Sequence, residues 1–322
     1  MSELKTITRR EFLAGGSLLL AGTALKLNAT PLLQSVPKEP IIDMHQHTSY
    51  LGRTAAQLLA HQRTMGITTT ILLPAGHPVN YGSTHYGVSN GLQAQVTPNE
   101  ASNQMAQQYP REFLFGANEV PDVANAIQEI EKYLKLGAPV IGELKFNIDC
   151  DAPEMQKIYE LAEAYEVPVV MHWQYKMFNW GFDRFHKMLE KYPRVNFIGH
   201  AQTWWANIDK NHTDQNMLYP KTKVTPGGIT DRLLQDYPNM FADMSAGSGL
   251  GAFTRDEEHA RAFLQRHQDK LIYGSDCADI AGQGEACLGA QMIAAIRRLA
   301  PSKKIERKLL YENARTLFKI KV

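Results

Sequence analysis

The stretch Ile41-Ile42-Asp43-Met44-His45-Gln46-His47 begins as an apolar run and ends in two histidines separated by one residue. A short apolar run of this kind is typical of a buried strand. Because side chains alternate along a strand, His45 and His47 are expected on the same face, where both imidazoles can bind one cation. A histidine pair alone is a weak signal, so its value depends on the residues at the ends of the other strands.

Seven further apolar runs occur along the chain, most of them separated by polar loops and amphipathic stretches. The eight runs cover residues 41–44, 68–73, 113–115, 140–145, 168–172, 195–199, 240–244 and 271–274. Strands that alternate with helical segments are typical of a parallel sheet with crossover helices, and eight such units predict a (β/α)8 TIM barrel of the α/β class. The chain has no GxGxxG turn and no GxxxxGK[ST] loop, so a doubly wound nucleotide-binding fold lacks its usual phosphate cradle.

Three more candidate ligands stand where other predicted strands end. His172 ends the fifth run, His200 follows the sixth, and Asp276 comes just after the eighth. The carboxyl ends of barrel strands meet at one mouth, so these groups are expected to join His45 and His47 there. Neutral imidazoles and one carboxylate hold a divalent ion such as Zn²⁺ and leave a position for water. A single histidine usually has a plain polar role, but the shared position of these residues favours a metal site.

Length and composition exclude several classes of protein. The 322 residues are 44% hydrophobic and 21% charged, close to the average for soluble globular proteins, which excludes a disordered or polytopic membrane chain. Basic residues outnumber acidic ones by only 34 to 33, so no net field attracts nucleic acid. Cys150, Cys277 and Cys287 are too few for a disulfide framework, although one disulfide stays open. Cys277 is expected to be a small packing residue.

The first 29 residues predict an export signal. Thr8-Arg9-Arg10-Glu11-Phe12-Leu13 resembles a twin-arginine motif and precedes a Gly/Leu/Ala stretch that ends at Leu25. We expect residues 1–29 to be removed and the protein to be periplasmic or exported through the twin-arginine machinery, with no membrane anchor after cleavage. Residues 30–322 are then a single catalytic barrel with loop insertions at about 74–109 and 202–226. Both insertions follow strands and are expected to lie over the barrel mouth.

Longer motifs surround the candidate residues, namely IIDMHQH at 41–47, YPREFLFGANEVP at 109–121, GELKF at 142–146, YELAEAYEVPVVMHW at 159–173, YPRVNFIGH at 192–200, FADMSAG at 241–247, YGSDC at 273–277 and YENARTLF at 311–318. In these segments the chain resembles the amidohydrolase superfamily, and within it the amidohydrolase 2 group of metal-dependent TIM-barrel enzymes similar to aminocarboxymuconate-semialdehyde decarboxylase. The resemblance implies one divalent ion, with Zn first and Mn, Fe or Ni as alternatives. It makes His200 and Asp276 the catalytic residues, His200 being the acid/base or electrostatic group, and the implied metal ligands are His45, His47, His172 and Asp276.

Five further residues are weaker candidates for substrate binding: Lys145, Glu143, Trp173, Trp204 and Arg53. Glu143 and Lys145 alternate onto one face of the fourth strand, where some superfamily members hold a second ion with a carboxylate or a carbamylated lysine. A single ion is preferred, with Lys145 as a substrate-binding cation and Glu143 as a partner inside the barrel. For the two tryptophans, a pocket wall and core packing both stay open. Arg53 could bind a carboxylate, although an exposed arginine on the first helix is more common.

These observations predict a metal-dependent hydrolase that uses a metal-activated water on an ester, lactone or amide of a small organic substrate. A non-oxidative decarboxylase of a small unsaturated or aromatic acid is the alternative within the same superfamily. A non-catalytic periplasmic ligand-binding barrel is the alternative of another class. The candidate base beside the metal ligands argues against it. The sequence leaves open the substrate, the metal in the cell and the choice between monomer and homodimer.

Overall fold

The computed structural model describes residues 39–84 and 95–321, and the chain from Pro40 onward forms one compact unit. The predicted export signal lies outside the described residues. The compact unit contains the eight strands that the apolar runs predict. They are β1 (Ile42–Gln46), β2 (Thr69–Leu72), β3 (Phe113–Phe115), β4 (Ile141–Leu144), β5 (Val169–His172), β6 (Phe197–His200), β7 (Met240–Asp243) and β8 (Leu271–Ile272).

The strands pair in parallel and in chain order, as β1-β2-β3 and β4-β5-β6-β7-β8. Short backbone contacts join the two groups into a ring. Ala117, just after β3, accepts a bond of 2.9 Å from Gly142 N–H and donates one of 3.0 Å to the carbonyl of Val140. On the other side, Met44 N–H of β1 donates to Tyr273 at 3.2 Å. The predicted (β/α)8 barrel is therefore confirmed.

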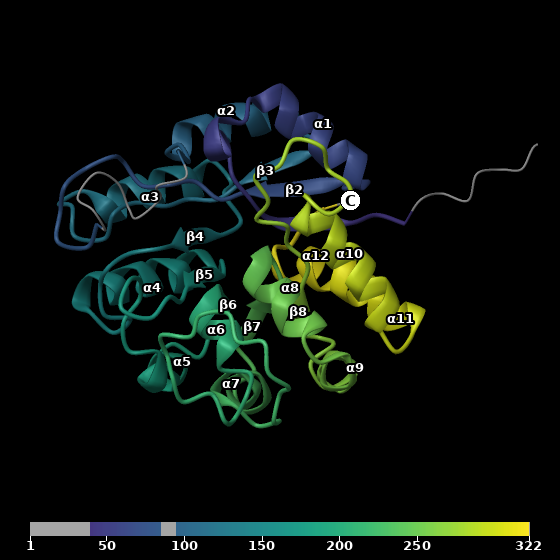
Figure 1. Cartoon of the computed structure of the whole chain (residues 1–322). Coiled ribbons are helices and arrows are strands. Elements are labelled where there is room, and N and C mark those ends of the chain that lie inside the picture. Colours follow the sequence, from purple (N-terminus) through teal and green to yellow (C-terminus); the bar gives the residue numbers. More distant parts are fainter. Residues whose placement is uncertain (1–38, 85–94, 322) are drawn as a thin grey trace, which may run out of the picture. The chain divides into compact units, whose positions relative to one another are not determined.

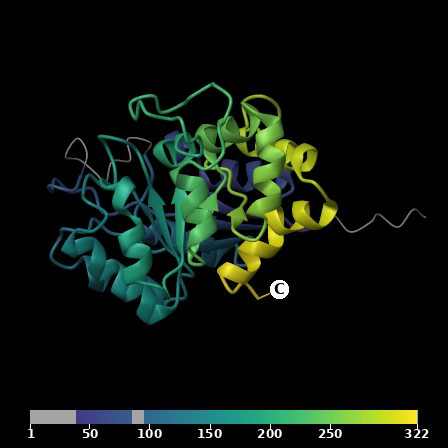
Figure 2. The same ribbon diagram turned by 90° about the horizontal axis from the view of Figure 1, so that it is seen from below.

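Helices cover the outside of this ring (Figures 1 and 2). None of those in the described part of the chain combines the length and the apolar character needed to cross a membrane. The α-helices are α1 (Ala55–Met65), α2 (Asn99–Gln108), α3 (Ala126–Lys135), α4 (Pro153–Tyr165), α5 (His186–Lys191), α6 (Gln202–Ala206), α7 (Ile229–Asp236), α8 (Ala246–Thr254), α9 (Glu257–Arg266), α10 (Leu288–Leu299), α11 (Lys303–Arg307) and α12 (Asn313–Leu317). The described residues also form two short 3-10 helices, η2 (Tyr50–Gly52) and η3 (Phe182–Arg184), and a π-helix, η4 (Lys308–Glu312).

Two apolar clusters divide the core. The larger one packs the outward strand faces against the helices. The smaller one contains residues of six strand regions around the ring, which can meet only inside the barrel, and the C-terminal residues Tyr311, Ala314 and Phe318 pack against them. Val170 and Ile198 belong to this interior plug. Two residues further along the same strands, the alternation turns the side chains that end β5 and β6 into the barrel as well.

Strands β1 and β4 depart from regular pairing near the mouth. The register of β1 with β2 shifts within residues 43–46, and that of β4 with β5 shifts within residues 141–144. Irregularities of this kind redirect side chains and are frequent next to functional sites. In β1 the shift allows Met44 to join the interior plug while its neighbour His45 also turns inward. Strict alternation would have placed these two side chains on opposite faces.

Candidate metal centre

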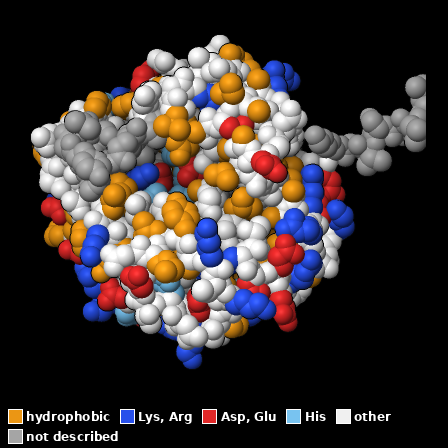
Figure 3. Space-filling view, in the orientation of Figure 1, with side chains coloured by type: hydrophobic (Ala, Val, Ile, Leu, Met, Phe, Trp, Pro, Cys, Tyr) orange, Lys and Arg blue, Asp and Glu red, His pale blue; other side chains and the backbone are white. Residues whose placement is uncertain are grey.

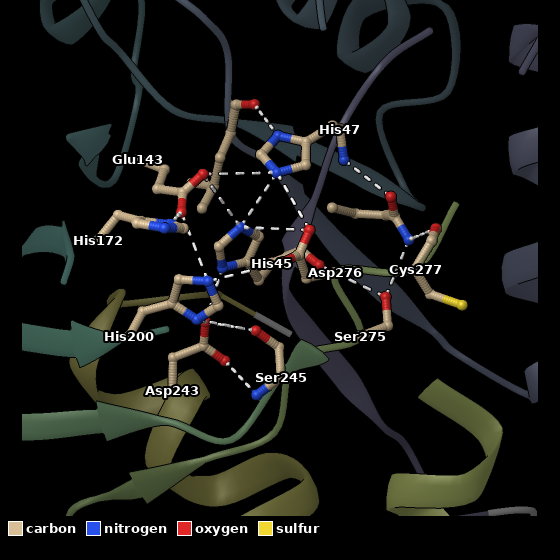
Figure 4. Close-up of polar contacts among 12 residues, drawn as sticks. His45, His47, Glu143, His172, His200, Asp243, Ser245, Ser275, Asp276 and Cys277 are labelled. Carbon is tan, nitrogen blue, oxygen red and sulfur yellow. Dashed lines mark hydrogen bonds and ion pairs between the residues drawn. The ribbon is translucent and has the colours of Figure 1, made fainter. Parts of the chain in front are cut away.

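Six ionisable side chains from the carboxyl ends of five strands meet in the mouth of the barrel (Figure 4). Figure 3 shows histidine and carboxylate atoms at the bottom of a hollow in this face of the compact unit. We call this group the mouth centre. Its members are His45 and His47 of the β1 region, Glu143 of β4, His172 of β5, His200 of β6 and Asp276 after β8.

Four donor atoms surround a common point on one side of the mouth centre. The Nε2 atoms of His45 and His47 are 3.1 Å apart, and each lies 3.7 Å from Oε2 of Glu143. Asp276 Oδ1 lies 3.4 Å from His47 Nε2 and 3.9 Å from His45 Nε2. Ligands of a tetrahedral ion with bonds near 2.0–2.1 Å are about 3.3 Å apart. Each carboxylate oxygen therefore lies near ligand spacing from the two imidazole nitrogens, and His45, His47 and Glu143 form a group that could hold one divalent ion.

Both histidines of this four-donor group are held from behind. His45 Nδ1 lies 2.6 Å from Asp243 Oδ2, and His47 Nδ1 lies 2.7 Å from the carbonyl of Leu73. A carbonyl can only accept, so the Nδ1 of His47 carries the proton and its Nε2 offers a lone pair. Contacts of this kind fix the tautomer and ring orientation of metal-binding histidines. The local hydrogen bonding thus directs the Nε2 atoms of both rings toward the same point.

The other side of the mouth centre shares Glu143 with the first. Its Oε1 hydrogen-bonds to Nδ1 of His172 and lies 3.4 Å from Nε2 of His200. His200 Nδ1 is oriented by Asp243 Oδ2 at 2.9 Å. His200 Nε2 and Asp276 Oδ1 are buried yet have no hydrogen-bond partner among the described residues. Unsatisfied buried donor atoms are costly, so the donor set fits a bound cation.

Electrostatics also favour a cation in the mouth centre. Burial opposes ionisation of Asp276, but His45 and the neighbouring imidazoles outweigh it and hold the pKa of this carboxyl well below its usual value. Burial likewise opposes ionisation of Glu143, whereas His172 and Lys145 lower its pKa well below the usual range. Burial and Lys145 lower the pKa of His172 to about 4, so its imidazole is neutral near pH 7. The group combines ionised carboxylates with a neutral imidazole, as a divalent ion requires.

The segment after β8 delivers Asp276 by a close backbone approach. A Cβ on Gly274 would lie 2.6 Å from Asp243 Oδ1 and 2.9 Å from the Cβ of His45, so only glycine fits there. Asp276 itself adopts a left-handed backbone conformation with φ of 40°. Its N–H donates to the carbonyl of His45 at 2.8 Å. This segment therefore packs against β1 and carries a strained residue at the site, a common feature of functional positions.

Two of the weaker sequence candidates have different surroundings from those expected. Glu143 lies among the candidate ligands, because its carboxylate is directed at the imidazoles of the mouth centre. Arg53 is 3% exposed and is not available to a substrate. Its guanidinium donates to the backbone carbonyls of Cys277 and Asp279 at 2.8 and 3.0 Å and to Gln46 Oε1 at 2.5 Å. Arg53 is therefore a clamp between β1 and the segment after β8.

Lys145 stays available for a ligand. It is only partly buried, and its ammonium makes no hydrogen bond or ion pair within residues 39–84 and 95–321. Its Nζ lies 5.4 Å from the ring centre of Phe178, whose ring contacts that of His172 at 5.4 Å. The contact holds the lysine close to one side of the mouth centre.

The tryptophans divide between the core and a cavity. Trp173 and Trp204 are fully buried and pack against Phe182, so the structure gives them the core role and not the pocket wall. Tyr175 and Trp180 are instead 40% and 41% exposed and line a cavity of about 400 Å³. The cavity wall also includes Gln174, whose Oε1 lies 3.4 Å from His172 Nε2. The cavity thus borders the mouth centre.

Asp243 and Tyr50 are site residues whose importance sequence reasoning missed. Asp243, at the end of β7, contacts both His45 and His200. The ring of Tyr50 packs edge-on against His47 at 5.2 Å. The Asp276 carboxylate and burial raise the pKa of Tyr50 above its usual value, so its hydroxyl stays protonated. The position of Tyr50 after β1 matches no motif in the sequence, whereas the position of Asp243 at the end of a strand was a usable signal.

The sequence matches the Amidohydro_2 family model, described as amidohydrolase, over residues 42–320. A search of curated proteins returned no match.

Solved structures with the same fold come from several bacteria. A probable 2-pyrone-4,6-dicarboxylic acid hydrolase from Acinetobacter baumannii matches with a TM-score of 0.56 and 14% identity over 87% of this chain and 99% of that chain. The 2,6-dihydroxybenzoate decarboxylase from Rhizobium matches with a TM-score of 0.55 and 15% identity over 88% and 99%. A dihydroxybenzoic acid decarboxylase from Polaromonas sp. JS666, which contains manganese, matches with a TM-score of 0.54 and 15% identity over 88% and 97%. At these identities the likeness establishes the fold.

Proposed function

Because the chain belongs to the amidohydrolase family, we propose that it is a metal-dependent hydrolase of an ester, lactone or amide bond in a small organic substrate. The observation that carries this proposal is the convergence of the Nε2 atoms of His45 and His47, 3.1 Å apart, with one carboxylate oxygen each of Glu143 and Asp276, which lie 3.4–3.9 Å from these nitrogens at the mouth of the barrel. Barrel enzymes keep their chemistry at this face. Reaction types differ within such folds, so the site and not the barrel supports the choice.

His45, His47, Glu143 and Asp276 would hold the ion. A bound divalent ion polarises a carbonyl and lowers the pKa of coordinated water. Nitrogen and oxygen donors favour Zn²⁺, with Mn²⁺ as the nearest alternative. A second ion between Glu143 Oε1 and the imidazoles of His172 and His200 is the competing arrangement, which metal titration distinguishes.

His200 is the proposed proton carrier when one ion is bound. Its Nε2 has no hydrogen-bond partner among the described residues and lies 3.6 Å from Asp276 Oδ2, while Asp243 and Ser245 orient its Nδ1 at 2.9 and 3.2 Å. An imidazole that is fixed on one nitrogen and free on the other can accept a proton from water and deliver it to a leaving group. Glu143 Oε1 at 3.4 Å and Asp276 Oδ2 at 3.6 Å are the carboxylate oxygens close enough to share that proton.

Lys145 supports a substrate that carries a carboxylate. Its ammonium makes no hydrogen bond or close ion pair with a described residue and lies next to the His172 side of the site. An ammonium is a suitable point charge for a carboxylate. The same feature favours the second candidate function, decarboxylation of a small aromatic or unsaturated acid, and two of the similar structures are decarboxylases of aromatic acids.

One experiment separates these functions. The purified protein is stripped with a chelator, reloaded with Zn²⁺ or Mn²⁺, and incubated with lactones, esters, amides and aromatic acids while products and released CO₂ are measured. We expect metal-dependent hydrolysis without CO₂, and its loss in His47→Gln; CO₂ release supports the decarboxylase. Full turnover by the stripped protein would contradict both functions, and saturable binding without turnover would support a non-catalytic binding barrel. Lys145→Gln should raise KM for acidic substrates about tenfold and leave neutral esters unaffected.

We also propose export of the folded protein, on the basis of the Arg9-Arg10 motif. Cell fractionation should find the protein in the periplasm. Replacement of both arginines by lysine should retain it in the cytoplasm, whereas an unchanged distribution would contradict the proposal.

A further inference from the structure

A second group of metal-binding side chains lies away from the mouth centre, between α1 and the segment that follows β8. We call it the α1 cluster. His61 comes from α1, Cys277 and Asp279 from the segment after β8, and Cys287 from the residue before α10. One ligand atom from each residue lies within 4.8 Å of all the others. His61, Cys277 and Cys287 are fully or almost fully buried.

The distances within the α1 cluster resemble those of a tetrahedral metal site. The two sulfur atoms of Cys277 and Cys287 are 3.7 Å apart, and Cys287 Sγ is 3.5 Å from His61 Nε2. Zinc bonds of about 2.3 Å to sulfur and 2.0–2.1 Å to nitrogen give tetrahedral separations of about 3.8 Å and about 3.6 Å. Asp279 Oδ2 lies closer, at 2.7 Å from Cys277 Sγ and 2.9 Å from His61 Nε2. This carboxylate would therefore move outward by less than about 1 Å on metal binding.

Backbone groups orient two of the four donors. Asp279 Oδ1 accepts the N–H groups of Ala281 and Gly282 at 2.8 and 2.9 Å, which directs Oδ2 toward the α1 cluster. Cys287 Sγ accepts the N–H of Ala290 at 3.3 Å, a contact that stabilises a thiolate. Outer contacts of this kind are what position ligands in metal sites.

We propose that the α1 cluster is a second metal site, built for Zn²⁺ or another thiophilic divalent cation, with His61, Cys277, Asp279 and Cys287 as ligands. Two sulfurs with one nitrogen and one carboxylate oxygen form a soft donor set that selects such an ion. On binding, the two thiols release their protons to solvent and the four residues complete the coordination shell. No position is left for water, so the site is structural.

The α1 cluster would fasten the segment that carries Asp276. Gly282 already approaches α1 so closely that a Cβ would lie 2.5 Å from the carbonyl of His61, and its φ is +67°. Arg53 clamps the same segment through the carbonyls of Cys277 and Asp279, and its charge offsets that of the thiolates. Metal binding would therefore hold residues 276–287 against α1 and keep Asp276 in place at the mouth centre.

The competing occupant of this position is a disulfide between Cys277 and Cys287. A disulfide requires sulfur atoms about 2.05 Å apart. It would not account for the positions of the His61 and Asp279 side chains beside the sulfurs. In the structure both cysteines are free, and the histidine and carboxylate lie at ligand distance from the sulfurs. The four-residue arrangement is therefore the reason to favour a metal.

Cobalt substitution tests the proposal directly. The purified full chain is stripped with a chelator and loaded with Co²⁺, whose bonds to thiolate give a sulfur-to-cobalt charge-transfer band in the near ultraviolet. We expect this band in the wild-type chain and in His47→Gln, which alters only the mouth centre. Absence of the band at full loading would overturn the proposal. A peptide in which a disulfide joins Cys277 to Cys287, lighter by two hydrogens than the peptide with free thiols, would also overturn it.

Matched variants locate the site. Cys287→Ser should abolish the charge-transfer band and remove about one equivalent of metal, whereas Cys150→Ser, a buried cysteine outside both groups, should keep both. If Cys287→Ser does not fold, His61→Gln should weaken Co²⁺ binding about tenfold or more. Unchanged metal content and spectrum in these variants would refute the site. Because the band comes only from cysteine ligands, failure of the mouth centre to bind metal would leave this result unaffected.

Discussion

The mouth centre and the α1 cluster both combine histidine with carboxylate, yet their donors are partnered differently. In the mouth centre, His200 Nε2 and Asp276 Oδ1 are buried without a hydrogen bond to any described residue. In the α1 cluster, the ligand atoms of His61, Cys277 and Cys287 already contact one another or Asp279. The first group retains donor atoms for a substrate or water, and the second is closed.

The difference shows that donor types and positions along the chain are insufficient to assign a role. The mouth centre has only nitrogen and oxygen donors and opens toward a hollow (Figure 3), whereas the α1 cluster adds two sulfurs and lies beneath α1. Closed sulfur-containing sites are structural, and sites that leave an open position are catalytic. The two groups should therefore respond differently to equivalent substitutions.

Asp276→Asn should have the largest effect. The change removes an anionic ligand of the mouth centre, so we expect kcat/KM to fall about a thousandfold or more, equivalent to about 4 kcal/mol. Asp279→Asn makes the same chemical change in the α1 cluster and should reduce kcat/KM by less than about threefold when metal is supplied. Steady-state kinetics with metal analysis measures both. Equal losses in the two variants would erase the distinction between the two regions.

Cys287→Ser should act on stability more than on turnover. Since a structural metal binds only the folded chain, we expect the free energy of unfolding to fall by about 3 kcal/mol. Denaturant unfolding with and without chelator, in an Asp276→Asn background, isolates this contribution from that of the mouth centre. Chelator sensitivity should persist in Cys150→Ser and disappear in Cys287→Ser; the opposite pattern would show that the α1 cluster holds no metal.

Asp243→Asn should produce an intermediate loss within the mouth centre. Asp243 touches no substrate in the proposed arrangement but orients His45 and His200 through contacts of 2.6 and 2.9 Å. Removal of such an orienting contact typically weakens metal binding and activity 10- to 100-fold, about 2 kcal/mol. The loss should be smaller than in Asp276→Asn and should appear in metal affinity as well as in kcat. If the variant kept full metal affinity, Asp243 would stabilise the barrel without orienting the metal ligands.

Asp231→Asn should lower stability without any effect on metal content. Burial opposes ionisation of Asp231, but His267, the N–H of Gly227 and Arg266 hold its pKa at about 2. Because this value lies below the usual 3.8, the ionised carboxylate stabilises the fold above about pH 4, and the contribution disappears as the pH falls toward 2. We expect the variant to lose about 2 kcal/mol at pH 7 and to approach the wild type near pH 2. If the difference in unfolding free energy between variant and wild type stayed constant from pH 7 to pH 2, the lowered pKa of Asp231 would be contradicted.

The fold could be read from the sequence to a large extent. Each of the eight predicted runs coincides with a strand, because a strand buried on both faces must be apolar along its length. The boundaries moved by at most two residues, as at β8, which is only Leu271–Ile272. The ring closure through Ala117 and Tyr273 gave no sequence signal, because single backbone contacts depend on the completed barrel.

The candidate site was predictable in part. The inward positions of His172 and His200 could be found because they follow from strand alternation alone, but His172, expected to bind the same ion as His45 and His47, hydrogen-bonds to Glu143 and lies outside the four-donor group. The partners of Glu143 and Arg53 could not be predicted, because their surroundings depend on segments far away in the chain. Arg53 was expected on the surface, but its guanidinium reaches carbonyls more than 220 residues further along.

The local sequence pattern was enough to predict the succession of strands in the barrel and the residue types at its mouth, because both follow from alternation over a few residues. The arrangement of donors around a common point needed the folded chain, since shifts in β1 and β4 redirect the side chains there. The α1 cluster depended on the fold even more, because His61 and Cys287 are 226 residues apart and become neighbours only when the barrel closes.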